Sequence, residues 1–141
     1  MTSTIRQQVV DAARSFIGTP YRHQGRFPGL ELDCAGLVVC AAQKAGIRVT
    51  DVSGYSRIPD GVTFIGGIEA QMDKIELCNI QPGDVLAFTF LTDPQHAAVV
   101  TAVEPRLTIV HAHMRVRNVV EHELDDVWRT RICGAYKFRG F

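Results

Sequence analysis

Residues 33–46 read DCAGLVVCAAQKAG, and this stretch decides which fold the chain can adopt. It predicts a helix that begins at Asp33 and is stopped by Gly46. The helix is apolar nearly all round, so we expect it to be buried in the core rather than to lie on the surface. Cys34 would then lie at the N-terminus of a buried central helix.

The residues before this stretch predict a first helix and a loop. Thr4 and Gln7 form a T-x-x-Q capping box, and Gly18 and Pro20 end the helix. The apolar stripe of this helix consists of Ile5, Val9, Ala12, Ala13, Phe16 and Ile17. The segment 19–32, TPYRHQGRFPGLEL, is rich in Gly, Pro and Arg and is expected to be a loop.

The residues after the helix predict a β-sheet. A turn at 82–84 precedes five β-rich runs: VLAFTF, HAAVVTAV, LTIVHAHM, VRNVVEHEL and ICGAYKF. Their spacing is too close for helical crossovers, so we expect an antiparallel meander. Between the central helix and the strands we expect a loop at 51–60 and a short helix within 63–76. Helices first and strands second predict an α+β fold in which the helix bearing Cys34 packs on the sheet.

Composition and charge exclude several classes of protein. The 141 residues are 46% hydrophobic and 21% charged, as in an ordinary globular protein, and they predict one domain over 1–141. Fifteen basic and fifteen acidic side chains cancel, which gives no electrostatic footprint for nucleic acid or an anionic membrane. No apolar run is long enough to span a membrane. The N-terminal residues lack the apolar region of a signal peptide, so we expect synthesis in the cytoplasm.

Three of the four cysteines are expected to be core thiols. Cys40, Cys78 and Cys133 have apolar neighbours, and free cysteine is usually buried. No C-x-x-C pair occurs, which argues against a structural zinc site. Without a signal peptide, disulfide bonds also lack the oxidising context that they need.

Cys34 has a different interpretation because of its place at the start of a helix. Unpaired backbone N–H groups and the helix dipole favour an anion there, so we expect a lowered thiol pKa. The small neighbours Ala35 and Gly36 leave room for a substrate carbonyl. Cys34 is therefore a candidate nucleophile, and the alternative is one more buried cysteine in an apolar helix.

Three histidines provide candidate partners for this thiol. His96 begins a predicted strand, beside a loop. His111 and His113 lie two residues apart in the next strand and so share one face. If the strands are neighbours, His96 can pair with one of them, and the second group then fixes the tautomer of the base. A structural role for each histidine and a metal site at the H-x-H pair are the alternatives. His23, in a loop, and His122, on a solvated strand face, gain no role from spacing.

Five short motifs in this order resemble the NlpC-type, papain-like cell-wall cysteine peptidases. They are GTPYR at 18–22, DCAGLV at 33–38, PGDVL at 82–86, HAAVV at 96–100 and IVHA at 109–112. The resemblance extends over residues 5–139. The YRHQ segment at 21–24 and the tryptophan with arginines at 127–131 are most similar to the small phage and prophage tail-associated members.

The resemblance implies a Cys-His-His triad. Cys34 matches the nucleophile and His96 the general base that takes the thiol proton. His111 matches the third, orienting residue, and His113 is the alternative for that role.

The resemblance also implies residues that bind the oxyanion or the substrate. At a few positions the sequence differs from the family pattern. Tyr21 matches a tyrosine near the nucleophile, and Asp33 belongs to the same D-C-A-G motif. Ala35 replaces a common Ser and Ala98 a common Gly, but both keep the side chain small. Gln24 departs from the usual Y-R-x-G-G pattern and agrees with the phage-like version.

The function that the resemblance implies is hydrolysis of amide bonds in peptidoglycan stem peptides, of the D-glutamyl–diaminopimelate type. No metal or other cofactor is expected. The expected partners are stem peptides and phage tail proteins, with the domain carried in a virion tail or acting at the cell wall. The alternatives are a papain-like amidase or acyltransferase, a non-catalytic tail or wall-binding module, and, third, a metal-binding protein.

Overall fold

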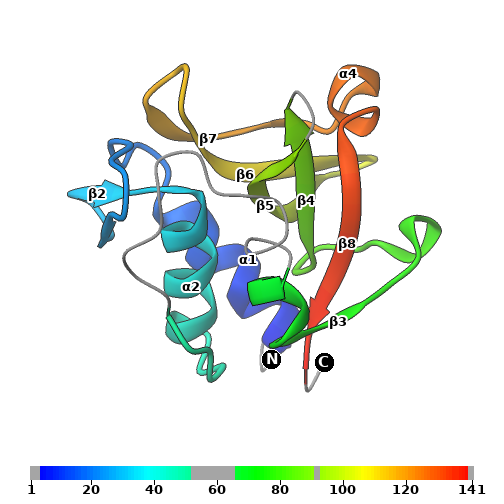
Figure 1. Ribbon diagram of the computed structural model, residues 1–141, viewed down its shortest axis with the longest axis horizontal. Helices are drawn as coiled ribbons and strands as arrows, with labels where there is room; N and C mark the ends of the chain where they lie inside the picture. Colours follow the sequence, from blue (N-terminus) through cyan, green and yellow to red (C-terminus); the bar gives the residue numbers. More distant parts are fainter. Residues whose placement is uncertain (1–3, 52–65, 91–92, 140–141) are drawn as a thin grey trace.

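Two helices pack against one face of a six-stranded antiparallel sheet in the computed structural model, which describes residues 4–51, 66–90 and 93–139 (Figure 1). The helices are α1 (Ile5–Ser15), α2 (Cys34–Lys44), the single turn α4 (Asp126–Arg129) and the 3-10 turn η1 (Leu77–Asn79). The sheet contains β3 (Met72–Lys74), β4 (Val85–Phe90), β5 (Asp93–Val103), β6 (Arg106–His113), β7 (Asn118–Glu123) and β8 (Ile132–Phe138). A separate two-stranded hairpin consists of β1 (Arg26–Phe27) and β2 (Glu31–Leu32). The predicted α+β class is confirmed.

The first helix follows its predicted bounds but not all of its predicted stripe. Thr4 Oγ1 accepts a hydrogen bond from Gln7 N at 3.1 Å, while the Gln7 side chain donates to Asp11 instead of completing the capping box. The buried residues of the stripe are Val9, Ala12, Ala13 and Phe16. Ile5 and Ile17, at the two ends of the stripe, are 43% and 46% exposed, and Ile17 lies beyond Ser15, the last residue of the helix.

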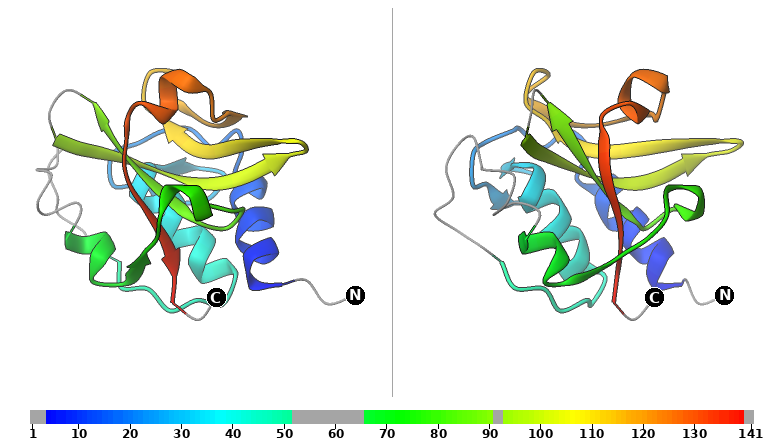
Figure 2. Two further views of the ribbon diagram at one scale, coloured as in Figure 1. Left: turned by 90° about the vertical axis from the view of Figure 1, so that its right-hand side faces the viewer. Right: turned by 45° about the vertical axis from the view of Figure 1, so that its right-hand side comes forward.

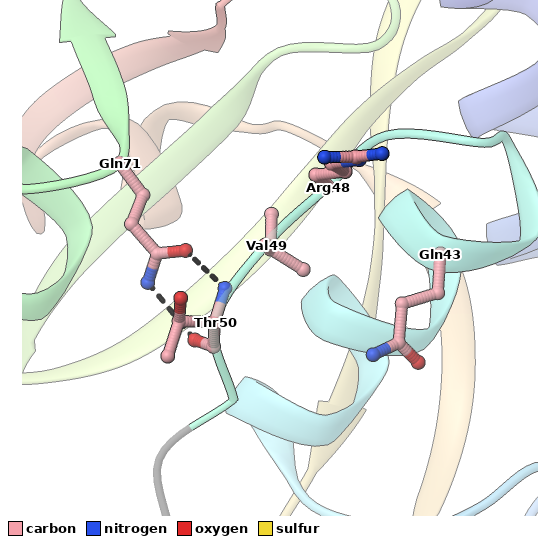
Figure 3. A pocket seen from close by; sticks show the side chains of 5 residues that line it. All are labelled: Gln43, Arg48, Val49, Thr50 and Gln71. Atoms are coloured by element: carbon pink, nitrogen blue, oxygen red, sulfur yellow. Dashed lines mark hydrogen bonds between the residues drawn. The ribbon is translucent and has the colours of Figure 1, made fainter.

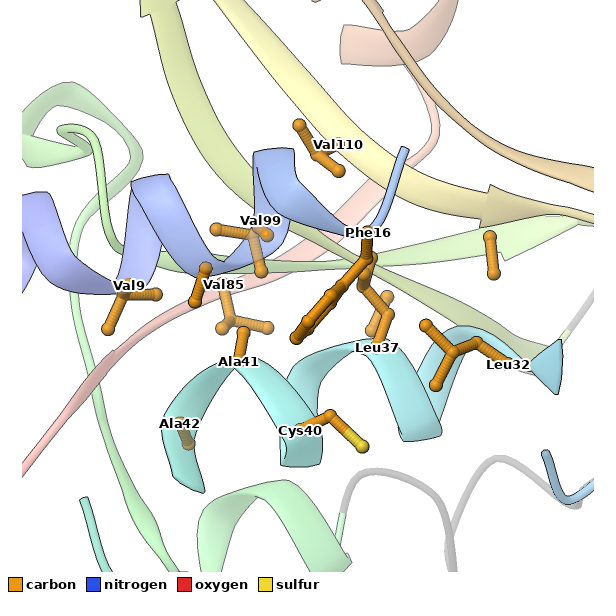
Figure 4. Packing of buried hydrophobic residues seen from close by; sticks show 14 of the residues in the cluster. Val9, Phe16, Leu32, Leu37, Cys40, Ala41, Ala42, Val85, Val99 and Val110 are labelled. Atoms are coloured by element: carbon orange, nitrogen blue, oxygen red, sulfur yellow. The ribbon is translucent and has the colours of Figure 1, made fainter. Parts of the chain in front are cut away.

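The second helix is buried, as predicted, and provides the centre of the core. Phe16, which follows α1, and Leu37 of α2 belong to one buried cluster with Val85, Val99 and Val110 of the sheet (Figure 4). This packing fixes the direction of α2, and therefore the place of Cys34 at its first turn. None of the helices in the described segments is long and apolar enough to cross a membrane.

The sheet follows the predicted meander for four strands and then departs from it. The strand order is β3-β8-β4-β5-β6-β7, so β8 returns to pair with β4 instead of following β7 at the edge. The segment that contains α4 carries the chain back over the sheet, on the face away from α1 and α2 (Figure 2). Within the predicted 63–76 helix, 66–69 are helical and Met72–Lys74 form β3, while 63–65 lie outside the described residues. Of the predicted 51–60 loop, only residue 51 is described.

A β-bulge bends the sheet beside His96. Phe88 pairs with His96, but the next pair is Thr89 with Pro94, so Gln95 is an extra residue in β5. The loop expected beside His96 is thus part of the strand, which begins at Asp93. Bulges increase the local twist and change the direction of nearby side chains. β6 and β7 cross β4 and β8 at a steep angle, and the long strand β5 joins the two parts, since its first half pairs with β4 and its second half with β6 (Figure 1 and Figure 2).

The predicted burial of the cysteines is correct for one of the three core candidates. Cys40 is buried on α2, at 9% exposure. Cys78 is exposed because it lies on η1, a single turn with no buried residue. Cys133 is exposed because a second bulge, between β4 and β8, leaves it as the extra residue of β8.

A close backbone contact explains the glycine two residues after Cys34. A Cβ atom on Gly36 would overlap the carbonyl oxygen of Gly25, in the loop before β1. Gly25 itself lies against the backbone of Glu31 and Leu32, so it has no room to retreat. The first turn of α2 can approach this loop only if residue 36 has no side chain.

We therefore expect Gly36→Ala to lower the free energy of unfolding by roughly 2 to 4 kcal/mol, because the added methyl group must displace a backbone carbonyl. The matched control is Gly66→Ala, where no atom lies within 4 Å of the new Cβ and stability should hardly change. Urea unfolding followed by the fluorescence of Trp128 measures both variants. Equal stability of Gly36→Ala and the unmutated protein would contradict this packing.

Candidate active site

The start of α2 is held by the buried carboxylate of Asp33, which is 3% exposed. Its Oδ1 accepts hydrogen bonds from Gly36 N at 2.7 Å and from Arg26 Nη1 at 2.9 Å. Its Oδ2 accepts from Gln24 N at 2.8 Å. Arg26 also pairs with Asp51 at 2.9 Å. Both oxygens of Asp33 are thus engaged within the protein, and a part for Asp33 in substrate or oxyanion binding stays a prediction.

The thiol of Cys34 lies between the helix and the sheet. It accepts hydrogen bonds from the backbone N–H groups of Ala35 and Ala97. Ala97 directly follows His96 in β5, so the start of α2 and the strand that carries the imidazole meet at this point.

Tyr21 is placed close to the same end of α2. Its backbone forms an isolated β-bridge with that of Leu32, two residues before Cys34. Its backbone N–H donates to the carbonyl of Arg117 at 3.0 Å. Its half-buried side chain packs against the main core. The loop at 19–32 and the β6–β7 turn are therefore joined beside the nucleophile, and the role of the Tyr21 hydroxyl stays a prediction.

The pKa of Cys34 is raised, whereas the helix N-terminus predicted a lowered one. Burial of the thiol is the largest cause, the charge of Asp33 is the second, and together they raise its pKa from 9.0 to about 12. The N–H groups of Ala97 and Ala35 and the charge of Arg26 act in the other direction, but they do not offset the burial. The resting form is therefore a neutral thiol.

His96 and His111 are hydrogen-bonded to each other. His96 Nε2 lies 2.7 Å from His111 Nδ1, and the two side chains are buried, at 7% and 0% exposure. His113 shares a face with His111, with ring centroids 5.0 Å apart, but its Nδ1 accepts from the backbone N–H of Arg115. Of the two predicted partners, the structure brings His111 to His96.

Both imidazoles of this pair are neutral at neutral pH. Burial lowers the pKa of His96 from 6.5 to about 3, and neighbouring histidine charges lower it further. Burial likewise lowers the pKa of His111 to about 2. Neither the thiolate nor the imidazolium is stable in the resting protein. His96 therefore takes the thiol proton only as the sulfur attacks the substrate.

His122 was predicted on a solvated strand face, and the structure corrects this. It is half-buried, its Nε2 lies 2.8 Å from His111 Nε2, and its Nδ1–H donates to the carbonyl of Glu123 at 2.9 Å. In the β6–β7 register Ile109 is opposite His122, so His122 shares a face with His111. Only this register reveals the position of His122, and the register cannot be read from the sequence.

Trp128 of α4 covers the histidines. Its ring centroid lies 4.9 Å from that of His111, 5.1 Å from that of His122 and 6.2 Å from that of His96. It also meets Phe88 edge to face at 5.3 Å. In the described part of the chain, no group of three or more His, Cys, Asp or Glu side chains is arranged to hold a metal ion.

A separate pocket of about 480 Å³ lies at the other end of α2. Gln43, Arg48, Val49, Thr50 and Gln71 line it (Figure 3). The Gln71 side chain accepts from Thr50 N at 2.5 Å and donates to Thr50 O at 2.9 Å, which ties the segment after α2 to the residues before β3. Among the described residues, no histidine or cysteine lines this pocket, and it is remote from Cys34, so we assign it no catalytic part.

We expect the protein to lose stability between pH 6.5 and pH 5. The unfolded chain binds protons at His96 and His111 in this range, whereas the folded chain, with both pKa values lowered, does not. Stability is therefore full above about pH 6.5 and falls by roughly 1.5 kcal/mol for each histidine by pH 5. Urea unfolding across this range measures it. A flat profile would contradict two buried neutral imidazoles, and His111→Gln should reduce the slope without abolishing it, since the pKa values of His96 and His113 are also lowered.

We also expect Cys34 to react slowly with iodoacetamide at pH 7, and faster with each unit up to pH 10, because its raised pKa leaves little thiolate. Peptide mass spectrometry after timed alkylation measures this, with the exposed Cys78 of the same sample as internal control. A rate at Cys34 that is already maximal at pH 6 would reveal a preformed thiolate and overturn the assignment.

Comparison with known proteins supports a family assignment. The model of the NlpC/P60 family matches residues 18–137. A probable endopeptidase of Mycobacterium tuberculosis is 38% identical over 94 residues, which are 67% of this chain and 20% of that protein. The gamma-DL-glutamyl hydrolase of Bacillus subtilis is 28% identical over 133 residues, 92% of this chain and 29% of that protein. The chain thus spans less than a third of either relative.

The fold is also that of a solved member. RipD of Mycobacterium tuberculosis, described as a non-catalytic NlpC/p60 domain protein adapted to peptidoglycan binding, superposes with a TM-score of 0.68 at 15% identity, over 99% of this chain and 100% of that one. The architecture is therefore the papain-like α+β fold of these domains, with N-terminal helices on a six-stranded antiparallel sheet. With the family match over most of its length, this chain belongs to the NlpC/P60 family.

Proposed function

We propose that the chain is a cysteine peptidase that hydrolyses amide bonds in peptidoglycan stem peptides, at D-glutamyl–diaminopimelate linkages. The observation that carries this proposal is the 2.7 Å hydrogen bond between His96 and His111. His96 lies on β5, and the backbone of its neighbour Ala97 contacts the Cys34 thiol. Membership of the NlpC/P60 family supports the reaction class. The names of the two relatives, an endopeptidase and a gamma-DL-glutamyl hydrolase, support a peptide bond next to glutamate.

In the proposed reaction, His96 moves one proton in each half. Because His96 Nε2 is bonded to His111, Nδ1 is the nitrogen that takes the thiol proton as Cys34 Sγ attacks the carbonyl carbon. The imidazolium is then stabilised through its Nε2–H bond to His111 Nδ1. His96 Nδ1–H protonates the departing amine, and an acyl-enzyme forms. Water, deprotonated by His96, attacks the thioester and releases the acid and the thiol.

The negative charge that forms on the carbonyl oxygen needs hydrogen-bond donors near the sulfur. The positive end of the α2 dipole lies beside the sulfur, and Tyr21 lies on the adjoining loop. We infer that the oxyanion binds there. Asp33 would contribute indirectly, since its carboxylate caps α2 and so holds Cys34 in position.

Peptidoglycan binding without catalysis is the second candidate function. RipD, which has the same fold, is described as having that function. The buried pairing of His96 with His111 favours catalysis in this chain, because a binding surface does not require two neutral imidazoles beneath a tryptophan. An amidase or acyltransferase would use the same residues on another acyl group.

We further propose that the domain is made in the cytoplasm and reaches the cell wall with a phage tail or by another route. The support is the resemblance of the YRHQ segment and of residues 127–131 to tail-associated members. Co-purification with tail proteins from induced lysogens would test this separately from the chemistry.

We expect the purified protein to release new amines from peptidoglycan, and Cys34→Ala to reduce the rate by at least three orders of magnitude, since the reacting groups act as a unit. Mass spectrometry of the products names the scissile bond. Unfolding curves show whether the variant is folded, and sedimentation with peptidoglycan shows whether it still binds. Binding without any product from either protein would favour the second candidate, and cleavage at a muramoyl–alanine bond would favour an amidase.

A further inference from the structure

Three histidines form one hydrogen-bonded chain that ends on the backbone. The chain runs from His96 Nε2 to His111 Nδ1 at 2.7 Å and from His111 Nε2 to His122 Nε2 at 2.8 Å. It ends at 2.9 Å between His122 Nδ1 and the carbonyl oxygen of Glu123. The three rings lie on three neighbouring strands, β5, β6 and β7, so the sheet holds them in position.

The last acceptor determines where every proton of this chain lies. A carbonyl oxygen only accepts, so His122 Nδ1 carries a hydrogen and, in the neutral ring, its Nε2 accepts. His111 Nε2 must then donate, which leaves Nδ1 of the neutral His111 as an acceptor. His96 Nε2 must donate to it, which leaves His96 Nδ1 with the lone pair that a base requires.

We propose that His122 is a positioning residue that, through His111, holds His96 in the tautomer whose Nδ1 takes the thiol proton. This inference rests on the proposed cysteine peptidase reaction. His122 touches neither the thiol nor the substrate in this scheme, so its effect passes entirely through His111. Each nitrogen of the His111 imidazole can be either a donor or an acceptor. A fourth residue is therefore required to fix the tautomer of His111, the third residue of the triad.

The opposite arrangement shows why the acceptor at residue 122 matters. A side chain that can only donate would make His111 Nε2 an acceptor and place the hydrogen on His111 Nδ1. That hydrogen would point at His96 Nε2 and force the hydrogen of His96 onto Nδ1. The base would then be blocked, although every ring stayed in place.

Two aromatic rings pack against His122. Trp128 covers it with ring centroids 5.1 Å apart, and His111 meets it edge to face at 4.9 Å. His122 is half-buried, so a substitution there does not open a large cavity. This allows the hydrogen-bonding character of residue 122 to be changed with the fold intact.

Three variants separate hydrogen bonding from shape. His122→Gln keeps an acceptor for His111 and a donor for the Glu123 carbonyl. His122→Phe keeps a ring without either, and His122→Arg offers donors only. The control is Glu123→Gln, which alters an exposed side chain paired with Arg106 and leaves the backbone carbonyl unchanged.

The first measurement is the tautomer itself, by long-range proton–nitrogen NMR of the histidine rings at pH 7.5. We expect His96 to carry its hydrogen on Nε2 in the unmutated protein, in His122→Gln and in Glu123→Gln. We expect a mixture in His122→Phe and the Nδ1–H form in His122→Arg. His96 with Nδ1–H in the unmutated protein, or an unchanged tautomer in His122→Arg, would overturn the proposal.

The second measurement is hydrolysis of a soluble stem peptide. We expect kcat to fall about tenfold to a hundredfold in His122→Phe, and further in His122→Arg, with KM nearly unchanged. His122→Gln should recover kcat to within about threefold, a rescue that a purely structural role would not give. Equal loss in His122→Gln and His122→Phe, with all variants folded, would overturn the proposal. Tautomers as expected without any hydrolysis would instead overturn the proposed function.

Discussion

The carboxylate of Asp33 accepts hydrogen bonds from the first turn of α2, from Arg26 and from the backbone of Gln24, and the position of the nucleophile depends on this contact. It ties the first turn of the central helix to the loop that leads into the β1–β2 hairpin. The bare backbone of Gly36 permits the close approach. The helix, the loop and the sheet then meet at Asp33 and Ala97, which are the direct neighbours of Cys34 and His96. The geometry of the site is therefore a consequence of how α2 is capped.

The same burial that makes this arrangement rigid also keeps it uncharged. The two imidazoles are buried and lie against Trp128, the thiol is half-buried at the start of α2, and burial penalises each ionised form. The negative charge of Asp33 adds to this penalty at Cys34, although its cap is needed to hold the helix. Charge therefore develops only during the attack, where the hydrogen bond to His111 can stabilise it.

The sequence contained enough information for α1, for α2 and for the antiparallel strands β4 to β7, because these follow from local patterns. Adjacent strands also predicted that His96 meets a histidine of the next strand, and the family resemblance favoured His111 over His113. It did not reveal features that depend on register. His122 looks solvated in the segment NVVEHEL, and only its alignment opposite Ile109 places it on the face of His111. Cys133 looks buried in ICGAYKF until the bulge against β4 moves it outward. The return of β8 to β4 depends on where α4 packs, which no neighbouring residue specifies.

The relay of imidazoles ends on a main-chain carbonyl, at Glu123. Every amino acid has such a carbonyl, so no exchange of side chain at position 123 can delete the final acceptor. The end of the relay is thus protected against point mutation in a way that a terminal carboxylate side chain would not be. It also leaves position 123 open to vary, so a comparison of related sequences would find the histidines and pass over the atom that gives them their direction.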